Sequence, residues 1–278
     1  MKKISIVTLL LISVLTFAQK KEKIKGSKIV KLEQKQVDNF ESIEVEDNLD
    51  VFLVKGNECG IEIEADDNLI EFVEYKLTGK NLRISTNREM SSYKKLSVRV
   101  IYTDNLNMII AKDETNITAL SDVVLENITF KSYDYAKLFL NAKTTNFTLM
   151  ANDKSKVELN LKSQKTTIDI SKSAYVKALI TSNEMRFDMY QKSSAEIEGD
   201  ILDLKLRLDN SADFSGKKLT AKTALIETGI NAKASINISN IATISASGNS
   251  EIELFGEPKI DLKNFSDSAL LKKRPAKN

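Results

Sequence analysis

QKSSAEIEGD, at residues 191–200, contains the pattern on which the fold depends. Its segment Ser194-Ala195-Glu196-Ile197 reads small, small, variable, large apolar. The same order occurs upstream in Ser173-Ala174-Tyr175-Val176 and downstream in Ser211-Ala212-Asp213-Phe214. The third position changes from aromatic to acidic while the fourth stays apolar, which indicates a structural repeat of about twenty residues.

Two series of apolar residues extend this repeat along the chain, with steps between 17 and 21 residues. A period near nineteen is too short for helical hairpins and too long for a heptad, and the signature of leucine-rich repeats is missing. Such a period is typical of a single-stranded parallel β-helix, whose strands pair one coil away. The sequence therefore predicts an all-β solenoid. The series are Ile117, Leu138, Val157, Val176, Ile197, Phe214, Ala234 and Ile252, and in phase with them Ile109, Ile128, Phe147, Ile168, Phe187, Leu206, Ile226 and Ile244.

Strand alternation assigns these positions to faces, because successive side chains point to opposite sides of a strand. Ala195 and Ile197 are expected to point inward, and we expect Val176 and Ile197 to lie directly above one another. A second inward column of Ala or Ser is expected at positions 136, 155, 174, 195, 212, 232 and 250. The outward column is then Lys137, Lys156, Tyr175, Glu196, Asp213, Lys233 and Glu251.

Residues 40–110 also alternate at period two and are expected to form the first coils and a strand-rich N-terminal cap. One helix is predicted over residues 67–77, where apolar residues fall near helical spacing. Gly256-Glu257-Pro258 and residues 260–271 are expected to close the other end of the solenoid, and Asn and Asp are expected to make the tight turns. The β-helix domain is predicted over residues 38–262.

The termini differ from this domain in composition. Residues 1–18 have the basic start, apolar run and small-residue end of a secretory signal peptide. Residues 19–37 are predicted to be a flexible basic lead-in and residues 263–278 a basic tail. The body between them holds 27 basic and 36 acidic residues, so nucleic-acid binding is not expected. An exported protein of the periplasm or cell surface is predicted, with no transmembrane span in the mature chain.

The chain has one cysteine, Cys59, and no histidine. A disulfide within the chain, a Cys/His or Ser/His/Asp mechanism and a histidine-ligated metal are therefore excluded. We predict no cofactor, no metal and no catalytic residue.

Three residues are weak surface candidates. Glu196 and Asp213 are expected side by side on adjacent coils, where they could share a proton or, with Asp209, bind calcium. Tyr175 is expected to face outward, and an exposed tyrosine can bind a glycan or a protein. A solvated face is the simpler interpretation of all three.

Four stretches give the chain a resemblance to a known family: Phe40-Glu41-Ser42-Ile43-Glu44-Val45, residues 50–56, Asn68-Leu69-Ile70 and Asn81-Leu82-Arg83-Ile84, followed by solenoid coils. This order resembles the autotransporter-adhesin head GIN domain over residues 38–262, a domain of unknown function in secreted Bacteroidota proteins. The resemblance implies a right-handed β-helix, a role in adhesion and no established active site. The glycine-rich turns of that family are mostly replaced here, with Ser247-Gly248-Asn249-Ser250 the nearest to them.

The sequence thus favours a non-enzymatic envelope or secreted protein that presents a surface for adhesion, with a glycan or an envelope protein as partner. The alternative is a polysaccharide lyase or hydrolase of the pectin-lyase-like type. It depends on likeness of fold and on the Glu196/Asp213 pair, and likeness of fold alone is a weak argument for activity.

Overall fold

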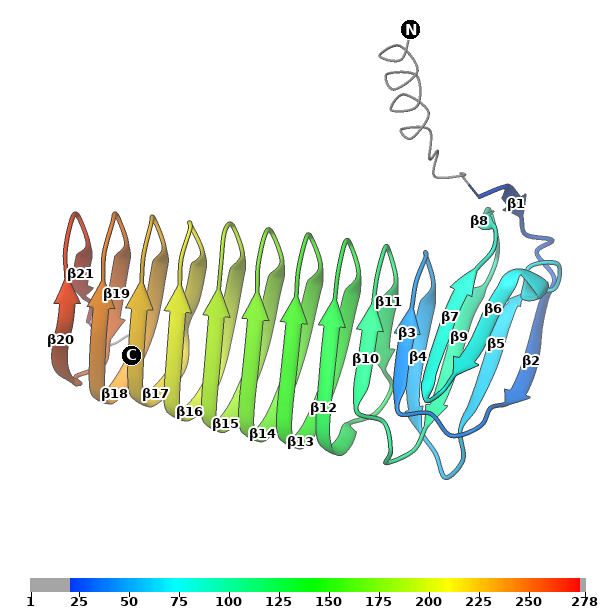
Figure 1. The fold of residues 1–278 in the computed structure, drawn as a ribbon, viewed down its shortest axis with the longest axis horizontal. Coiled ribbons are helices and arrows are strands. Elements are labelled where there is room, and N and C mark those ends of the chain that lie inside the picture. The colour runs from blue at the N-terminus through cyan, green and yellow to red at the C-terminus, as the bar shows by residue number, and fades with distance from the viewer. Residues whose placement is uncertain (1–20, 276–278) are drawn as a thin grey trace, which may run out of the picture.

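The computed structural model describes residues 21–275. They form a long solenoid of stacked β-coils with a closed end at the N-terminal side (Figure 1). The predicted signal peptide at residues 1–18 lies outside the described residues. The elements are β1 (Lys23–Lys25), β2 (Val30–Gln36), β3 (Ser42–Val45), β4 (Asp50–Lys55), β5 (Gly60–Asp66), the 3-10 helix η1 (Ile70–Phe72), β6 (Val73–Thr78), β7 (Asn81–Thr86), β8 (Glu89–Ser91), β9 (Leu96–Tyr102), β10 (Met108–Ala111), β11 (Asn116–Ala119), β12 (Val123–Ser132), β13 (Lys137–Ala151), β14 (Lys156–Ile170), β15 (Tyr175–Met189), β16 (Ser194–Leu208), β17 (Asp213–Thr228), β18 (Lys233–Ala246), β19 (Glu251–Phe255), β20 (Lys259–Phe265) and β21 (Leu270–Lys273).

Each long strand from β13 to β18 bends once and so contributes to two faces of the solenoid. In β13 and β14 the ladder breaks at the bend, between the pairs Thr144↔Ser163 and Asn146↔Lys165. The first face contains segments 137–143, 156–162, 175–181, 194–200, 213–220 and 233–237, and the second contains 146–151, 165–170, 184–189, 203–208, 223–228 and 241–246. All these pairings are parallel, so the predicted all-β solenoid is confirmed.

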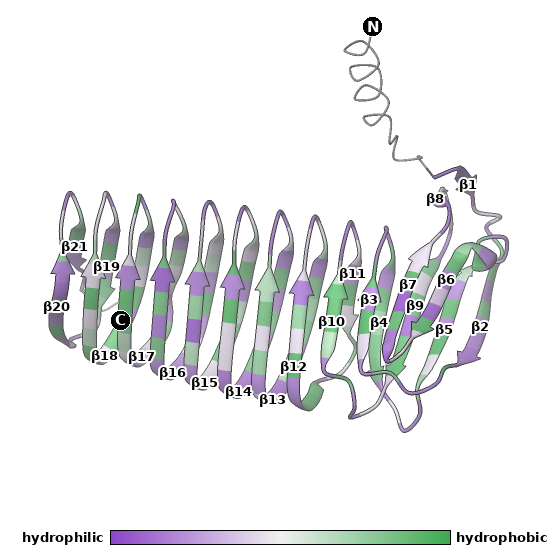
Figure 2. Ribbon diagram, in the orientation of Figure 1, coloured by the Kyte–Doolittle hydropathy of each residue, from purple (hydrophilic) through white to green (hydrophobic). Residues whose placement is uncertain are grey.

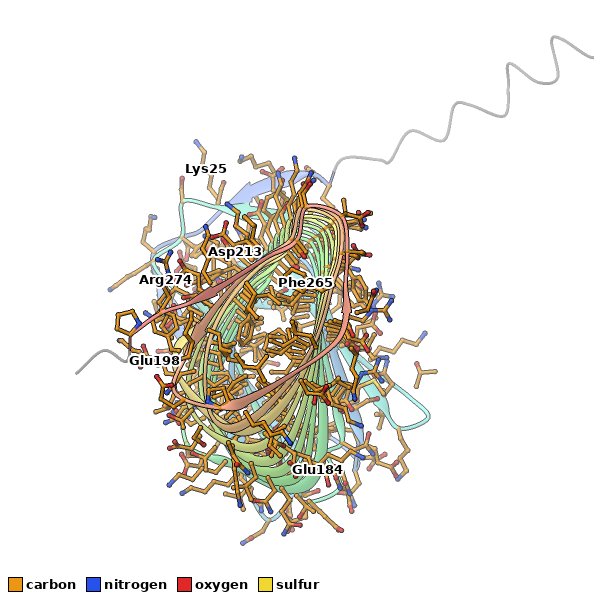
Figure 3. All side chains as sticks on the ribbon, turned by 90° about the vertical axis from the view of Figure 1, so that its left-hand side faces the viewer. Lys25, Glu184, Glu198, Asp213, Phe265 and Arg274 are labelled. Atoms are coloured by element: carbon orange, nitrogen blue, oxygen red, sulfur yellow. The ribbon has the colours of Figure 1, made fainter. Side chains whose placement is uncertain are left out.

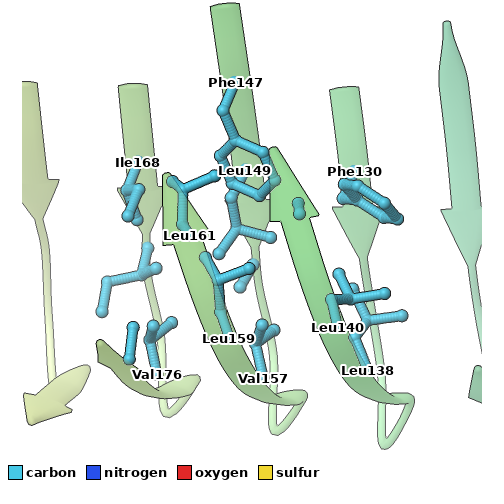
Figure 4. Close-up of a cluster of buried hydrophobic side chains, with 14 of the residues drawn as sticks. Phe130, Leu138, Leu140, Phe147, Leu149, Val157, Leu159, Leu161, Ile168 and Val176 are labelled. Carbon is cyan, nitrogen blue, oxygen red and sulfur yellow. The ribbon is translucent and has the colours of Figure 1, made fainter. Parts of the chain in front are cut away.

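The core lies between the two faces. Leu159 and Leu161 point inward from the first face toward Phe147 and Leu149 of the second (Figure 4). Along each strand buried residues alternate with exposed ones, as the bands of Figure 2 show. Burying a large aliphatic or aromatic side chain contributes about 1.5–3 kcal/mol. A chain without an internal disulfide is therefore held together by these columns.

The predicted columns are correct in direction and wrong in register at three places. Val176 lies opposite Ala195, and Ile197 lies opposite Ala178, so Val176 and Ile197 both point inward but are not stacked. In the same way the column of Ala and Ser residues passes through Ser193 and not through Ala195. The carbonyl of Ser193 accepts a hydrogen bond from the amide of Asp213 at 3.0 Å. In the second series the columns shift by two residues early on, since Ile109 pairs with Phe130 and Phe147 with Thr166.

Turns between the faces use left-handed residues that are mostly not glycine. Asp113, Asp134 and Asp153 have φ of 55°, 55° and 61°, a conformation that aspartate tolerates. Their carboxylates also tie coils together: the amide of Asp113 donates to Asp134 at 3.2 Å, and the amide of Asp134 donates to Asp153 at 3.4 Å. Asn210, Asn231 and Asp267 also have positive φ, whereas other coils use Lys172, Gln191 or Gly248, so the prediction that Asp and Asn make the turns is confirmed for most of them.

The N-terminal end is closed by antiparallel strands. β2 pairs with β5, β5 pairs with β9, and β6 pairs with β7, all antiparallel. The expected lead-in is therefore wrong for residues 30–36, which form β2 because the edge of β5 accepts them. The helix predicted over 67–77 is also wrong: only Ile70–Phe72 is helical, and residues 73–78 form β6 because they pair with β7. The buried carboxylate of Asp66 accepts from the amides of Lys28, Lys94 and Lys95, which fixes this closed end.

At the C-terminal end the expected closure is replaced by one more coil. β20 pairs in parallel with β18, and β21 pairs in parallel with β19. Residues 263–265 and 270–273, expected in a tail, belong to these strands. Their backbone groups form ladder hydrogen bonds with β18 and β19, and these bonds hold the segment in the solenoid instead of leaving it as a solvated tail.

Candidate functional site

The first face carries an open groove of about 450 Å³ across β11 and β13–β16. Strand register arranges its lining in two rows. Thr118, Phe139, Glu158, Lys177 and Glu196 occupy one row on successive coils. Asn141, Asn160, Leu179 and Glu198 occupy the next. Neighbours in a row lie about 4.8 Å apart, the spacing of the strands.

The middle of the groove is unusually apolar for an outward face. Phe139 is 38% exposed and Leu179 is 50% exposed. Beside them Asn141 and Asn160 are directly paired across β13 and β14, so two amide groups lie next to each other. An apolar floor with adjacent amides can contact the hydrocarbon face of a ligand and hydrogen-bond its polar groups at the same time.

One of the three sequence candidates lines this groove, and a second contacts it. Glu196 lines it, opposite Lys177 on one side and Ser215 on the other. The hydroxyl of Tyr175 donates a hydrogen bond to Glu196; burial, this bond and the charge of Glu196 raise the pKa of Tyr175. The structure thus brings Tyr175 and Glu196 together.

Asp213 does not join them as predicted. It lies opposite Ser194 and Lys233, two positions along the strand from the partner of Glu196. The Glu196/Asp213 pair is therefore wrong, because Ser194 and not Glu196 continues the column of Tyr175. Figure 3 shows Asp213 and Glu198 pointing outward at separate places.

Directly paired carboxyl groups do occur, but on the second face. Asp169 lies opposite Asp188, and Arg186 contacts Asp188 with its Nε at 2.7 Å from Oδ2. Burial raises the pKa of Asp169, and the charge of Asp188 and a hydrogen bond to it raise the pKa further. The sequence carried a signal for this pair, since Asp169 and Asp188 are nineteen residues apart, one coil length.

The described residues contain no group of three or more His, Cys, Asp or Glu side chains that could hold a metal ion. In the same part of the chain no helix is long and apolar enough to cross a membrane. Cys59 is buried and 4% exposed, with its sulfur 4.0 Å from the hydroxyl of Thr103.

Together the stacked coils and the lateral groove define a β-solenoid whose outer surface is built from repeated positions. The family described as "Putative auto-transporter adhesin, head GIN domain" matches residues 39–258, and the chain belongs to this family. The predicted resemblance is thereby confirmed, and family membership supports an adhesion-like, non-enzymatic role at the surface of a cell or outside it. A search of curated proteins found no match to the sequence.

Solved structures agree on the fold. A putative adhesin from Parabacteroides merdae is 14% identical, with 91% of this chain and 98% of that chain covered and a TM-score of 0.66. A putative adhesin from Parabacteroides distasonis is 15% identical, with 90% and 100% covered and a TM-score of 0.67. A protein from the same organism, described as a putative lipid binding protein, is 13% identical, with 91% and 100% covered and a TM-score of 0.67.

Proposed function

We propose that this protein is an exported, non-enzymatic adhesion module whose first-face groove binds a neutral glycan of a cell surface. The observation that carries the proposal is the exposed floor of Phe139 and Leu179 beside the paired amides of Asn141 and Asn160. Sugars present both hydroxyl groups and apolar ring faces, and this floor offers a partner for each.

The shape of the groove supports an extended ligand. Its lining comes from equivalent positions on successive coils, so similar groups recur about every 4.8 Å along the solenoid. A polymer with repeating units can contact several coils in the same way. Many weak contacts of this kind add up, which is how an adhesive surface gains strength without a deep pocket.

The charge of the groove favours a neutral ligand. Glu158 and Glu196 both flank Lys177 in one row, and Glu198 forms an ion pair with Lys218 at 2.9 Å, so the row keeps an excess of one negative charge. Acidic polysaccharides and nucleic acids would be repelled, because like charges across a binding surface oppose association.

One observation favours the alternative of a polysaccharide hydrolase. Glu158 and Glu196 flank Lys177 in one row, and two coil spacings separate them by about 9.6 Å. This is close to the upper limit of about 9.5 Å for inverting glycosidases. Asp169 and Asp188 do not fit such a reaction, because hydrogen-bonded carboxyl groups lie closer than the roughly 5 Å that a retaining pair needs.

A glycan array with matched variants tests the proposal. Asn141→Ala with Asn160→Ala should abolish binding to neutral glycans. Asn146→Ala is the control, since the Asn146 amide donates to Asn127 at 2.7 Å in a similar amide pair on the second face and lies outside the groove. Equal loss in both variants, or no neutral glycan bound by the wild type, contradicts the proposal. Release of sugar fragments that Glu196→Ala abolishes would establish the hydrolase instead.

The exported location has its own test. Brief treatment of intact host cells with a protease should degrade the protein if it lies on the outside of the cell. Full protection that is lost only when the outer envelope is opened would place it in the periplasm.

A further inference from the structure

The two ends of the solenoid differ in how they cover the core. At the N-terminal end antiparallel strands and η1 close it, and the outermost core residues Ile61, Ile63 and Leu69 are at most 2% exposed. At the C-terminal end the coil of β20 and β21 lies in front when the molecule is viewed along its axis (Figure 3). Within residues 21–275 no strand pairs with the outer edge of either.

The open end exposes residues that belong to the core columns. Ile260 and Leu262 lie opposite Ala242 and Ile244, which are both 0% exposed. Ile260 is 40% exposed, Leu262 50% and Phe265 41%. An apolar column that ends in solvent beside unpaired backbone groups is a strong template for another strand.

From the unpaired edge of β20 and its exposed apolar residues we infer that two copies of the chain associate tail to tail. In this dimer β20 of one copy pairs antiparallel with β20 of the other. A two-fold axis normal to the sheet reverses both the solenoid axis and the strand direction, so β20 meets its copy antiparallel. Head-to-tail stacking is disfavoured, because β2 at the other end runs antiparallel to its neighbour and so breaks the parallel order of the solenoid coils.

Charge complementarity and exposure together select the register. A centre on Ile260 would also place opposite charges together, Asp261 against Lys259, but Leu262 is the more exposed of the two core residues, at 50% against 40%. If the pairing centres on Leu262, each Asp261 lies opposite Lys263 of the other copy, and the two Leu262 side chains meet. A centre on Asp261 or on Lys263 would instead place like charges opposite each other, which is unfavourable. Within one copy Lys263 already lies 2.8 Å from Asp261, so association joins two ion pairs into one network. The ladder has a register shift just after Leu262, so Lys263 has no partner residue on β18.

The sheet that β20 joins is that of the second face, and a two-fold axis normal to it does not exchange the two sides of the dimer. Both first-face grooves would therefore lie on the same side of the dimer. A ligand with repeated units could then engage both grooves at once, which raises the effective affinity by linkage rather than by new contacts. The dimer stands independently of the glycan proposal, because the groove and the open end share no residue.

Cross-linking tests the register directly. In an antiparallel pair, opposed Cα atoms lie about 4.5–5.5 Å apart, a separation that a disulfide can span. Leu262→Cys should therefore oxidise to a covalent dimer. Leu32→Cys is the matched control, since Leu32 on the closed end is 59% exposed and should stay monomeric on the same gel. The native Cys59 is buried and should not contribute.

Sedimentation gives the second readout. At about 0.1 mM, which detects micromolar association, the purified protein should have about twice the mass of its own monomer. Asp261→Lys should weaken the dimer at least about tenfold, and adding Lys263→Asp should restore it. A monomeric wild type, equal cross-linking of both cysteine variants, or a mass that grows without limit would each overturn the inference.

Discussion

Gly199 on β16 gives the sharpest test of how tightly the coils stack. Its φ is +113°, and a Cβ at this position would lie 2.1 Å from the carbonyl oxygen of Ile180 on the neighbouring coil. Gly79, between β6 and β7, has φ +61°, and a Cβ there would have nothing within 4 Å. The two glycines therefore separate the effect of backbone conformation from the effect of close packing.

The expected magnitudes differ clearly. Gly79→Ala costs only the left-handed conformation, about 1 kcal/mol. Gly199→Ala adopts a rarer conformation, which costs up to about 3 kcal/mol, and it displaces the Ile180 carbonyl, which weakens a ladder hydrogen bond worth about 1 kcal/mol. The free energy of unfolding should therefore fall by about 3 kcal/mol more for Gly199→Ala than for Gly79→Ala.

Urea unfolding followed by circular dichroism measures this difference. The slope with denaturant should stay the same in both variants, because neither changes the surface exposed on unfolding. In a thermal scan the same difference corresponds to a Tm lower by roughly 6–12 °C. If the two variants unfold within about 0.5 kcal/mol of each other, the close approach of Gly199 and Ile180 does not exist.

Three further predictions concern charge and packing. Asp169 has a raised pKa in the folded protein, through burial first and then its carboxylate neighbour, so its contribution to stability is present at low pH and lost as the pH rises through the folded value. Asp169→Asn should therefore raise the free energy of unfolding at pH 7 but not near pH 3, and an equal gain at both would contradict this. Burial would raise the pKa of Glu46, but hydrogen bonds from two cations, one of them Lys112, lower it from 4.5 to about 2. Its contribution is present above pH 4.5 and lost as the pH falls toward about 2, so Lys112→Met should move the midpoint of acid unfolding to higher pH, and an unchanged midpoint would refute the role of this contact. Phe214→Ala, at a residue that is 0% exposed, should cost about 3–5 kcal/mol, whereas Phe139→Ala in the groove should change stability by less than about 0.5 kcal/mol; similar losses in urea unfolding would show that Phe139 is core.

The register error at Val176 shows what a repeat pattern leaves open. A slip of two residues keeps every side chain on its original face, so Ala195 and Ile197 both satisfy the inward pattern. The steps of 21 from Val176 to Ile197 and 17 from Ile197 to Phe214 were the signal. Two steps of nineteen residues lead from Val176 through Ala195 to Phe214. Coils of constant length keep the stacked strands in the same register.

The candidate site was predictable only in part. The outward direction of Tyr175 and Glu196 followed from alternation, and both lie on the first face. Their contact depends on register, and so does the correction of Asp213. The exposed floor of Phe139 and Leu179 was not predicted. In the sequence alone, a single apolar residue at an outward position cannot be distinguished from chance variation of the pattern.

The sequence by itself determined the solenoid, its alternating strands and its left-handed Asp and Asn turns, because these depend on period and on local backbone chemistry. Only the tertiary structure decided which residues stack, that β2 closes one end, and that Leu262 is left exposed at the other. Those outcomes depend on pairing between segments distant in sequence, where several registers satisfy the same pattern and the ladder of backbone hydrogen bonds selects one.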